Sequence, residues 1–226
     1  MFKIKFKKEN NYIKTIQMRT TVITKEIQNR LTPRAILEDL LEGNKRFREA
    51  AKEKVDYLSQ VKQTVGGQFP KAVILSCIDS RVPVEVIFDQ SIGDIFVARV
   101  AGNFENVDML GSMEYSCKVA GSKLVLVLGH ESCGAVKAAC DGVELGNITA
   151  MLSKIIPAVH LSATQVDGEV NSSNKKMVAK TVANNVLMTI DRIREKSPIL
   201  KEMETSGEIK IVGGVYHLST GEVEIL

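Results

Sequence analysis

Two thiols and an imidazole are spaced so that they could hold a metal ion. Cys77 follows an apolar run, and His130 and Cys133 follow a second run. Thiolate and imidazole ligands suit zinc, and three protein ligands leave the fourth tetrahedral position open, as in catalytic zinc sites. A His-x-x-Cys spacing alone is weakly specific, because such residues more often pack inside a protein. The prediction therefore depends on what surrounds Cys77.

The residues after Cys77 add a carboxylate and a guanidinium. Asp79 and Arg81 are separated by one residue, so their side chains can pair. Most such pairs are surface salt bridges that contribute little to stability. Directly after a cysteine at the end of a strand, the pair has a second interpretation. The carboxylate would lie near a metal, and the guanidinium would hold the carboxylate.

Cys133 is predicted to begin a helix. The dipole at a helix N-terminus lowers the pKa of a thiol and favours the thiolate that binds metals. Gly134 is expected to relieve crowding where the chain turns. The other cysteines and histidines have no partner motif and are expected to be buried as small hydrophobes or to be structural or exposed: Cys117, Cys140, His160 and His217.

The elements that must position these residues alternate between strand and helix. Apolar runs predict strands over 72–77, 95–100 and 123–129, a terminal strand pair over 209–216 and 222–225, and helices over 33–50, 106–120, 148–163 and 175–196. This order predicts an α/β fold with a mainly parallel central β-sheet flanked by helices, an N-terminal helical arm and a C-terminal strand pair. Cys77 and His130 would then lie at the same edge, where the carboxyl ends of parallel strands meet.

Length and composition suit one domain. The chain has 226 residues, 44% of them hydrophobic, and we expect a single domain over 32–226 preceded by a basic extension over 1–31. Residues 1–30 hold eight Lys or Arg against two Glu, so the basic excess is local. This extension is either solvated or, through the alternating pattern of 2–7, an added edge strand or a partner contact.

The chain lacks the signals of other compartments. No apolar stretch is long enough to span a membrane, and no secretory signal is recognised, so a cytoplasmic location is expected. Four cysteines in such a chain favour metal binding or catalysis over a disulfide framework. No nucleic-acid partner is expected.

At this point the sequence resembles the β-class carbonic anhydrases, and within them the plant-type subgroup. The resemblance covers about 33–226 and rests on five segments: 42–47, 77–81, 96–103, 130–134 and 216–221. It implies reversible hydration of carbon dioxide to bicarbonate and a proton. Zinc-bound hydroxide, with one Zn2+ per subunit on Cys77, His130 and Cys133, would attack the substrate, and the dyad of Asp79 and Arg81 would orient it.

The resemblance also implies a substrate pocket. Gln68 would donate a hydrogen bond to bicarbonate, Phe96 and Tyr115 would shape an apolar pocket for carbon dioxide, and Gly134 would border the substrate. Members of the family build this cleft at a dimer interface, so a homodimer or a larger homo-oligomer is implied. Asp79 could also become a fourth metal ligand in a closed state that excludes water.

One position departs from a part of the family. The subgroup that has a non-catalytic bicarbonate site carries a tryptophan three residues before the first zinc cysteine, where this chain has Ile74. The chain contains no tryptophan, so inhibition through that site is not expected.

Three other functions remain open at this stage. Hydrolases of carbonyl sulfide or carbon disulfide resemble the family and differ in the pocket. A non-enzymatic zinc or bicarbonate-binding module would not need Asp79 and Arg81. A thiol redox protein would be expected to carry a Cys-x-x-Cys motif, which this sequence lacks.

Overall fold

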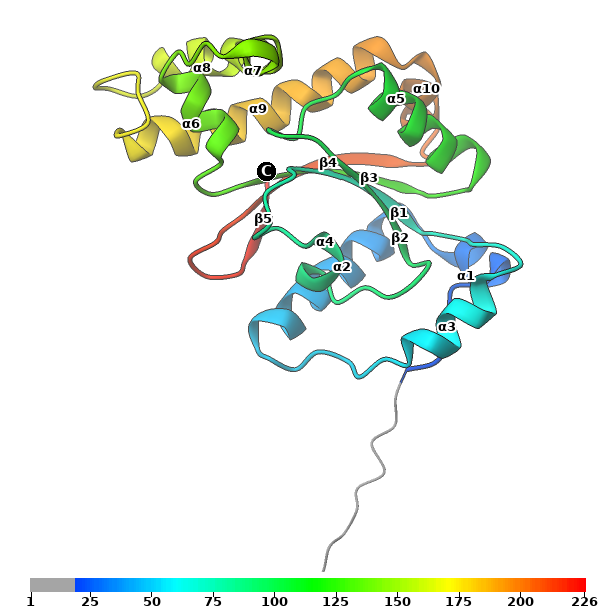
Figure 1. Cartoon of the computed structure of the whole chain (residues 1–226). Coiled ribbons are helices and arrows are strands. Elements are labelled where there is room, and N and C mark those ends of the chain that lie inside the picture. The colour runs from blue at the N-terminus through cyan, green and yellow to red at the C-terminus, as the bar shows by residue number, and fades with distance from the viewer. Residues whose placement is uncertain (1–18) are drawn as a thin grey trace, which may run out of the picture.

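A five-stranded sheet forms the centre of the computed structural model, which describes residues 19–226 (Figure 1). The strands are β1 (Ala72–Ser76), β2 (Ile95–Arg99), β3 (Leu124–His130), β4 (Lys210–Tyr216) and β5 (Val223–Ile225), in the order β2-β1-β3-β4-β5. The first four are parallel, and β5 is antiparallel to β4. The predicted α/β fold with a mainly parallel sheet and a C-terminal strand pair is confirmed.

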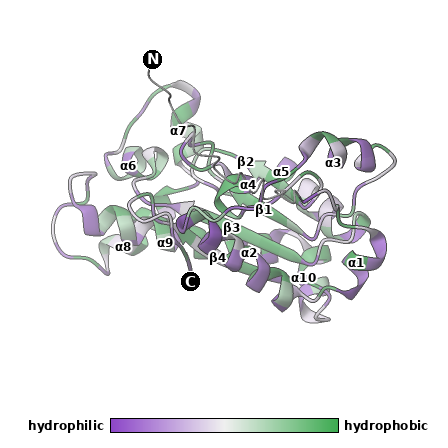
Figure 2. Cartoon of the chain, turned by 90° about the horizontal axis from the view of Figure 1, so that it is seen from below, coloured by the Kyte–Doolittle hydropathy of each residue, from purple (hydrophilic) through white to green (hydrophobic). Residues whose placement is uncertain are grey.

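Helices cover both faces of the sheet. As a result, β1 and β3 are buried along their whole length. One face packs against α2 (Pro33–Arg48) and α4 (Val84–Ile87). The other packs against α5 (Val107–Glu114), α9 (Lys175–Lys196) and α10 (Pro198–Thr205). Figure 2 shows the matching pattern, with hydrophobic residues along the central strands. Two apolar layers therefore hold the strand ends in fixed positions.

The two longest helices begin where side chains cap them. Thr32 accepts a hydrogen bond from the N–H of Ala35 at the start of α2, and Asn174 accepts one from Met177 at the start of α9. The second helix lies close to the sheet. A Cβ atom on Gly213 would come within 2.6 Å of Val186. Glycine on β4 therefore lets α9 approach the sheet closely.

A third apolar cluster covers the carboxyl ends of the strands. It joins α6 (Gly134–Cys140), α7 (Gly146–Leu152) and α8 (Ile156–Ala163) to the first half of α9. The sequence predicted one helix over 148–163, which is wrong. The chain forms two helices there, because Pro157 is accommodated only in the first turn of a helix, and α8 begins at the residue before it.

Several short elements were not predicted. They are α3 (Tyr57–Thr64), α4 and α10, whereas α1 (Lys25–Arg30) agrees with the predicted N-terminal helical arm. The helix expected over 106–120 is also interrupted, since α5 gives way to a π-helical turn, η1 (Tyr115–Val119). The unpredicted helices and η1 are too short for a helical period of apolar residues to show clearly in the sequence.

Part of the predicted extension packs on the sheet domain. Gln28 on α1 is 1% exposed and donates to the carbonyls of Pro70 and Ala120. Arg19 pairs with the buried Asp94 at 3.0 Å. The alternating pattern of 2–7 lies outside the described residues, and the division at residue 31 stays a prediction.

Within residues 19–226, none of the helices combines the length and the apolar character that a membrane crossing needs. The cytoplasmic location stays a prediction.

Candidate metal centre

Neighbouring parallel strands bring the predicted ligands together. Cys77 directly follows β1, and His130 is the last residue of the adjacent β3. Ser132 adopts a left-handed backbone with φ of 56°, which turns the chain between His130 and Cys133. Cys133 then stands at the N-cap of α6. The prediction that strand ends at one edge of the sheet gather these residues is confirmed.

The three side chains form a buried cluster. The Cys77 and Cys133 sulfurs and an imidazole nitrogen of His130 lie within 4.8 Å of one another, and each residue is at most 4% exposed. Nδ1 of His130 lies 2.9 Å from the carbonyl oxygen of Glu131, which orients the ring. Nε2 is buried and has no hydrogen-bond partner among the described residues. Two sulfurs and a free ring nitrogen at this spacing suit a tetrahedral zinc site.

The two thiols influence each other strongly, since their sulfurs lie 4.0 Å apart. The hydrogen bond with Cys133 lowers the pKa of Cys77 to about 4, with further support from His130 and the N–H of Gly102. Cys77 and burial in turn raise the pKa of Cys133 above its usual range. The sequence predicted that the helix N-terminus lowers the pKa of Cys133. The helix N–H groups do lower it, but the neighbouring thiolate outweighs them.

Asp79 and Arg81 pair beside this cluster. Nε and Nη2 of Arg81 donate to the two carboxylate oxygens at 2.9 and 2.7 Å, and the N–H of Arg81 adds a third bond at 2.9 Å. The Arg81 guanidinium holds the pKa of Asp79 well below its usual range. Oδ2 of Asp79 lies 3.8 Å from Nε2 of His130. An oriented carboxylate therefore faces the ligand atoms.

Arg99, which the sequence analysis did not single out, fixes the backbone of this loop. It stands at the end of β2 and donates to the carbonyls of Cys77 at 2.8 Å and Asp79 at 2.6 Å. Its place within the family-like segment 96–103 was the available signal. Because β2 is the neighbour of β1, a guanidinium at the end of β2 can reach the carbonyls of the loop that follows β1.

The predicted substrate residues lie elsewhere in the same chain. Gln68 is exposed and precedes β1, whereas Cys77 follows that strand. Phe96 lies near the beginning of β2 and pairs with Val73. Its ring centroid is 6.2 Å from that of Tyr115. Within one chain, Phe96 and Tyr115 therefore lie close to each other. They lie where β1 and β2 begin, whereas the candidate ligands lie where the strands end.

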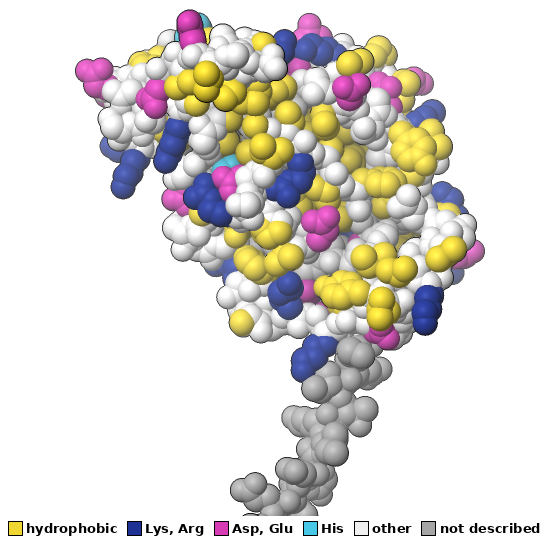
Figure 3. All heavy atoms as spheres, in the orientation of Figure 1, with side chains coloured by type: hydrophobic (Ala, Val, Ile, Leu, Met, Phe, Trp, Pro, Cys, Tyr) yellow, Lys and Arg dark blue, Asp and Glu magenta, His cyan; other side chains and the backbone are white. Residues whose placement is uncertain are grey.

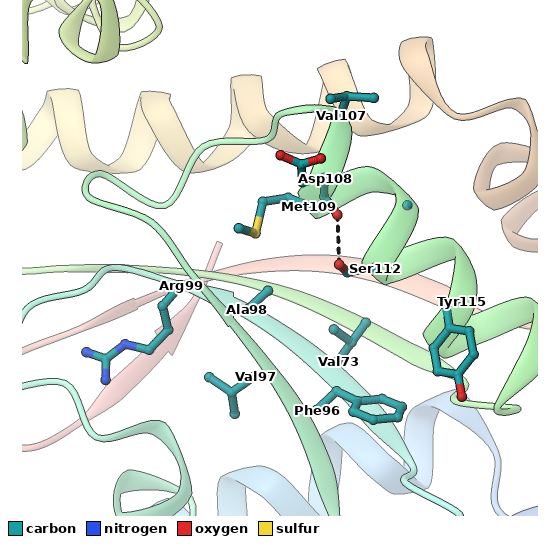
Figure 4. Close-up of a pocket in the computed structure, with 11 residues that line it drawn as sticks. Val73, Phe96, Val97, Ala98, Arg99, Val107, Asp108, Met109, Ser112 and Tyr115 are labelled. Atoms are coloured by element: carbon teal, nitrogen blue, oxygen red, sulfur yellow. Dashed lines mark hydrogen bonds between the residues drawn. The ribbon is translucent and has the colours of Figure 1, made fainter. Parts of the chain in front are cut away.

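These two rings line a cavity of about 820 Å³ between β2 and α5 (Figure 4). Figure 4 shows the rings of Phe96 and Tyr115 near each other and Arg99 at the opposite side of the view. Val107 and Met109 add apolar walls. The cavity lies along β2, which is an edge strand of the sheet.

Gly134 follows Cys133 at the surface. A Cβ atom there would meet no other atom of the described chain within 4 Å. The prediction that glycine relieves crowding at this turn is therefore wrong within one chain. The residue leaves open space beside the buried cluster.

Comparison with known proteins decides the family. The family model described as carbonic anhydrase matches residues 72–223. Carbonic anhydrase 2 of Mycobacterium tuberculosis is 36% identical over 198 residues, which cover 84% of this chain and 90% of that protein. This chain belongs to the carbonic anhydrase family.

Other relatives agree with this family. The carbonic anhydrase of Mycolicibacterium smegmatis is 34% identical over 163 residues, covering 70% of this chain and 75% of that protein. The structure of the Coccomyxa β-carbonic anhydrase in complex with acetazolamide has a TM-score of 0.66 and 26% identity, covering 84% of this chain and 86% of that one. The chain is thus a carbonic anhydrase of the β class, as its motifs predicted. The plant-type subgroup stays a prediction.

Proposed function

We propose that this carbonic anhydrase hydrates carbon dioxide reversibly to bicarbonate and a proton at one zinc ion per subunit, held by Cys77, His130 and Cys133. The observation that carries the proposal is the buried cluster of two sulfurs and one ring nitrogen within 4.8 Å. Its donor set fits zinc, since it provides two soft thiolates, one imidazole and an open fourth position. Zinc bound there would supply a water of lowered pKa and a Lewis acid.

Asp79 and Arg81 would orient the reacting oxygen. Asp79 stays ionised because Arg81 lowers its pKa, and its Oδ2 faces the ligand atoms from 3.8 Å. An ionised carboxylate only accepts hydrogen bonds, so it would accept a hydrogen bond from a hydroxyl group in that space. The lone pair of that oxygen would then point at the substrate carbon. Arg81, with three hydrogen bonds to Asp79, would hold the carboxylate in this orientation.

We further propose that two copies complete each site. Residues of β2 are half-buried or exposed, unlike those of β1 and β3. Two large apolar side chains that line the cavity along this edge are exposed: Val107 at 79% and Tyr115 at 54%. Figure 3 shows hydrophobic side chains spread over much of one face of the molecule. An edge strand with apolar surroundings is an expected site of association.

In one chain, Gln68, Phe96 and Tyr115 lie away from the candidate ligands. Antiparallel association of two copies along their β2 edges would explain this separation. The beginning of β2 in one copy would then lie beside the end of β2 in the other. Gln68, Phe96 and Tyr115 of one copy would thereby approach the metal centre of the other, as the plant-type resemblance implies. Gly134 would leave room there for a substrate oxygen, because nothing in its own chain fills the space beside it.

The proposal is tested by stopped-flow hydration of carbon dioxide on purified protein whose zinc content is measured by elemental analysis. We expect one zinc per subunit and rapid hydration. Cys133→Ala should lose both zinc and activity, because one of three ligands is gone. Cys140→Ala is the matched control, since Cys140 is also buried and lies in the same apolar cluster.

Two outcomes would contradict the proposal. Full activity with normal zinc in Cys133→Ala would exclude the ligand set. Faster turnover of carbonyl sulfide than of carbon dioxide by the parent protein would instead assign the same centre to the other substrate.

A further inference from the structure

The turn that follows β2 reaches the sulfur of Cys77. Gly102 has φ of 81° and Asn103 has φ of 43°, so two successive residues are left-handed. This conformation directs the N–H of Gly102 at Sγ of Cys77, at 3.4 Å. The position is crowded, because a Cβ on Gly102 would lie 2.5 Å from Cδ1 of Ile155. The backbone of this turn therefore places the N–H of Gly102 as a hydrogen-bond donor to the sulfur of Cys77.

Asn185 holds the same residue from the other side. It lies in the middle of α9, 83 positions further along the chain, and its Nδ2 donates to the carbonyl of Gly102 at 2.8 Å. The carbonyl and the N–H of Gly102 thus join α9 to Cys77. Because α9 packs against the sheet and against α8, it is a firm support for this contact.

One half of the Asn185 amide is used by the turn and the other half is not. Asn185 is 1% exposed, and its Oδ1 has no partner among the described residues. An unpaired buried polar atom lowers stability, because it has lost its hydrogen bonds to water. The side chain is next to Val186 and lies in a helix whose buried face is largely apolar. An apolar residue would remove the unpaired Oδ1 but would leave the buried carbonyl of Gly102 without the donor from Asn185, so the amide is placed to serve Gly102.

We propose that Asn185 is a positioning residue for the metal centre: it fixes Gly102 so that its N–H meets the sulfur of Cys77. This inference rests on the proposed zinc site. A backbone N–H bonded to a ligating thiolate withdraws electron density from the sulfur and fixes its direction. Loss of the amide would let the turn relax, and the sulfur would lose both its hydrogen bond and its orientation.

The chain offers a matched control at the next position. Asn184 is also buried in α9, but its Nδ2 donates to Ser162 at 2.8 Å and to Gln165 at 2.9 Å, on the side of α8. Asn184→Leu therefore removes buried amide hydrogen bonds from the same helix without touching Gly102. Asn185→Leu keeps the number and branching of the side-chain heavy atoms and removes the bond to the turn.

The experiment compares zinc affinity, by competition with a chelator, and the sulfur-to-metal charge-transfer band of the cobalt(II)-substituted protein. We expect Asn185→Leu to bind zinc about ten- to a hundredfold more weakly and to shift the cobalt band. Asn184→Leu should leave both unchanged, even if it lowers the melting temperature. If either leucine variant fails to fold, Asn185→Ala and Asn184→Ala give the same comparison.

The inference is overturned if Asn185→Leu keeps the zinc affinity and the cobalt spectrum of the parent, or if both positions weaken zinc binding equally. In either case the parent would still bind zinc, and the proposed function would stand. A parent protein that binds neither zinc nor cobalt would overturn the proposed function together with this inference.

Discussion

We propose two alternative roles for the carboxylate of Asp79 at the candidate metal centre. Its oxygens pair with Arg81 in the structure, which suits the orientation of a reacting oxygen. It is also attached only two residues after Cys77, so a movement of this loop could turn an oxygen toward the open metal position and exclude water. Arg99, which holds the carbonyls of Cys77 and Asp79, restrains that movement.

We predict that Asp79→Asn lowers hydration about ten- to a hundredfold at alkaline pH while zinc stays bound. The amide keeps the size of the carboxylate but loses the charge that Arg81 pairs with, and it presents a donor where an acceptor is needed. Stopped-flow rates and zinc content measured on the same sample provide the check. Asp191→Asn, at an exposed residue of α9, is the control.

Cobalt-substituted protein separates the two roles of Asp79. A closed state would change the cobalt spectrum of the parent as pH falls, and Asp79→Asn would remove that change. If the parent loses activity at low pH without any change in coordination, the closed state is not formed.

At the scale of elements, the close contact between α9 and the sheet supports the whole site. A Cβ on Gly213 would lie 2.6 Å from Val186 and 2.9 Å from Ile190. The same helix carries Asn185 and covers the strands that end at the ligands. The separation between α9 and β4 therefore matters for stability and, through Asn185, for the proposed metal centre.

We predict that Gly213→Ala lowers the free energy of unfolding by about 1–3 kcal/mol, because the added methyl overpacks this contact. The cost should be smaller in a Val186→Ala background, where the nearest obstructing atoms are gone. Urea unfolding of the two single variants and the double variant measures this coupling. Additive losses would show that Val186 does not limit the space beside Gly213.

The ion pair between α9 and α10 gives a stability effect that depends on pH. Burial raises the pKa of Glu204, but the hydrogen bond and charge of Arg194 outweigh it, so the pKa lies below its usual value. The carboxylate is bound by Nε and Nη2 of Arg194 at 2.8 and 2.9 Å. A lowered folded-state pKa means that the pair stabilises the fold above the unfolded-state pKa of about 4.3.

We predict that Glu204→Gln lowers the free energy of unfolding by up to about 1 kcal/mol at neutral pH, as for a partly exposed pair. This difference should shrink as pH falls through the folded-state pKa, because the parent carboxylate is then protonated as well. Urea unfolding at a series of pH values measures the trend. Glu202→Gln, at an exposed position of α10, should show no such trend. A difference that stays constant into strongly acidic solution would contradict the ion-pair account.

For the whole molecule, activity depends on association if the site is shared between two copies. Val107 begins α5, is 79% exposed and lines the cavity with Phe96 and Tyr115. A charge there would have to be buried in any interface that covers this cavity, at a high cost in free energy.

We predict that Val107→Lys yields a monomer that keeps its zinc and loses most of its hydration activity. Analytical ultracentrifugation and stopped-flow rates provide the measurement. Leu187→Lys is the control, since Leu187 is 44% exposed on α9 and does not line that cavity. A fully active monomer of Val107→Lys would contradict the shared site.

The sequence by itself determined the fold class and the three residues of the buried cluster, because both depend on local pattern. Buried runs ended at Cys77 and His130, and parallel strands must bring their carboxyl ends to one edge. The bounds of α9 could also be predicted, since Asn174 caps a long apolar period that ends before Pro198. The division of 148–163 was missed because the period continued across Pro157.

Only the tertiary structure decided how the thiols share their charge and what supports them. The opposite pKa shifts of Cys77 and Cys133 arise from 4.0 Å between sulfurs that are 56 residues apart in the chain. Asn185 meets Gly102 across 83 residues. No period or motif contains such contacts, because they depend on how closely a helix approaches a sheet. Phe96 is likewise separated from the candidate ligands because it lies near the beginning of β2 and pairs with Val73. The spacing of residues in the sequence does not reveal this pairing.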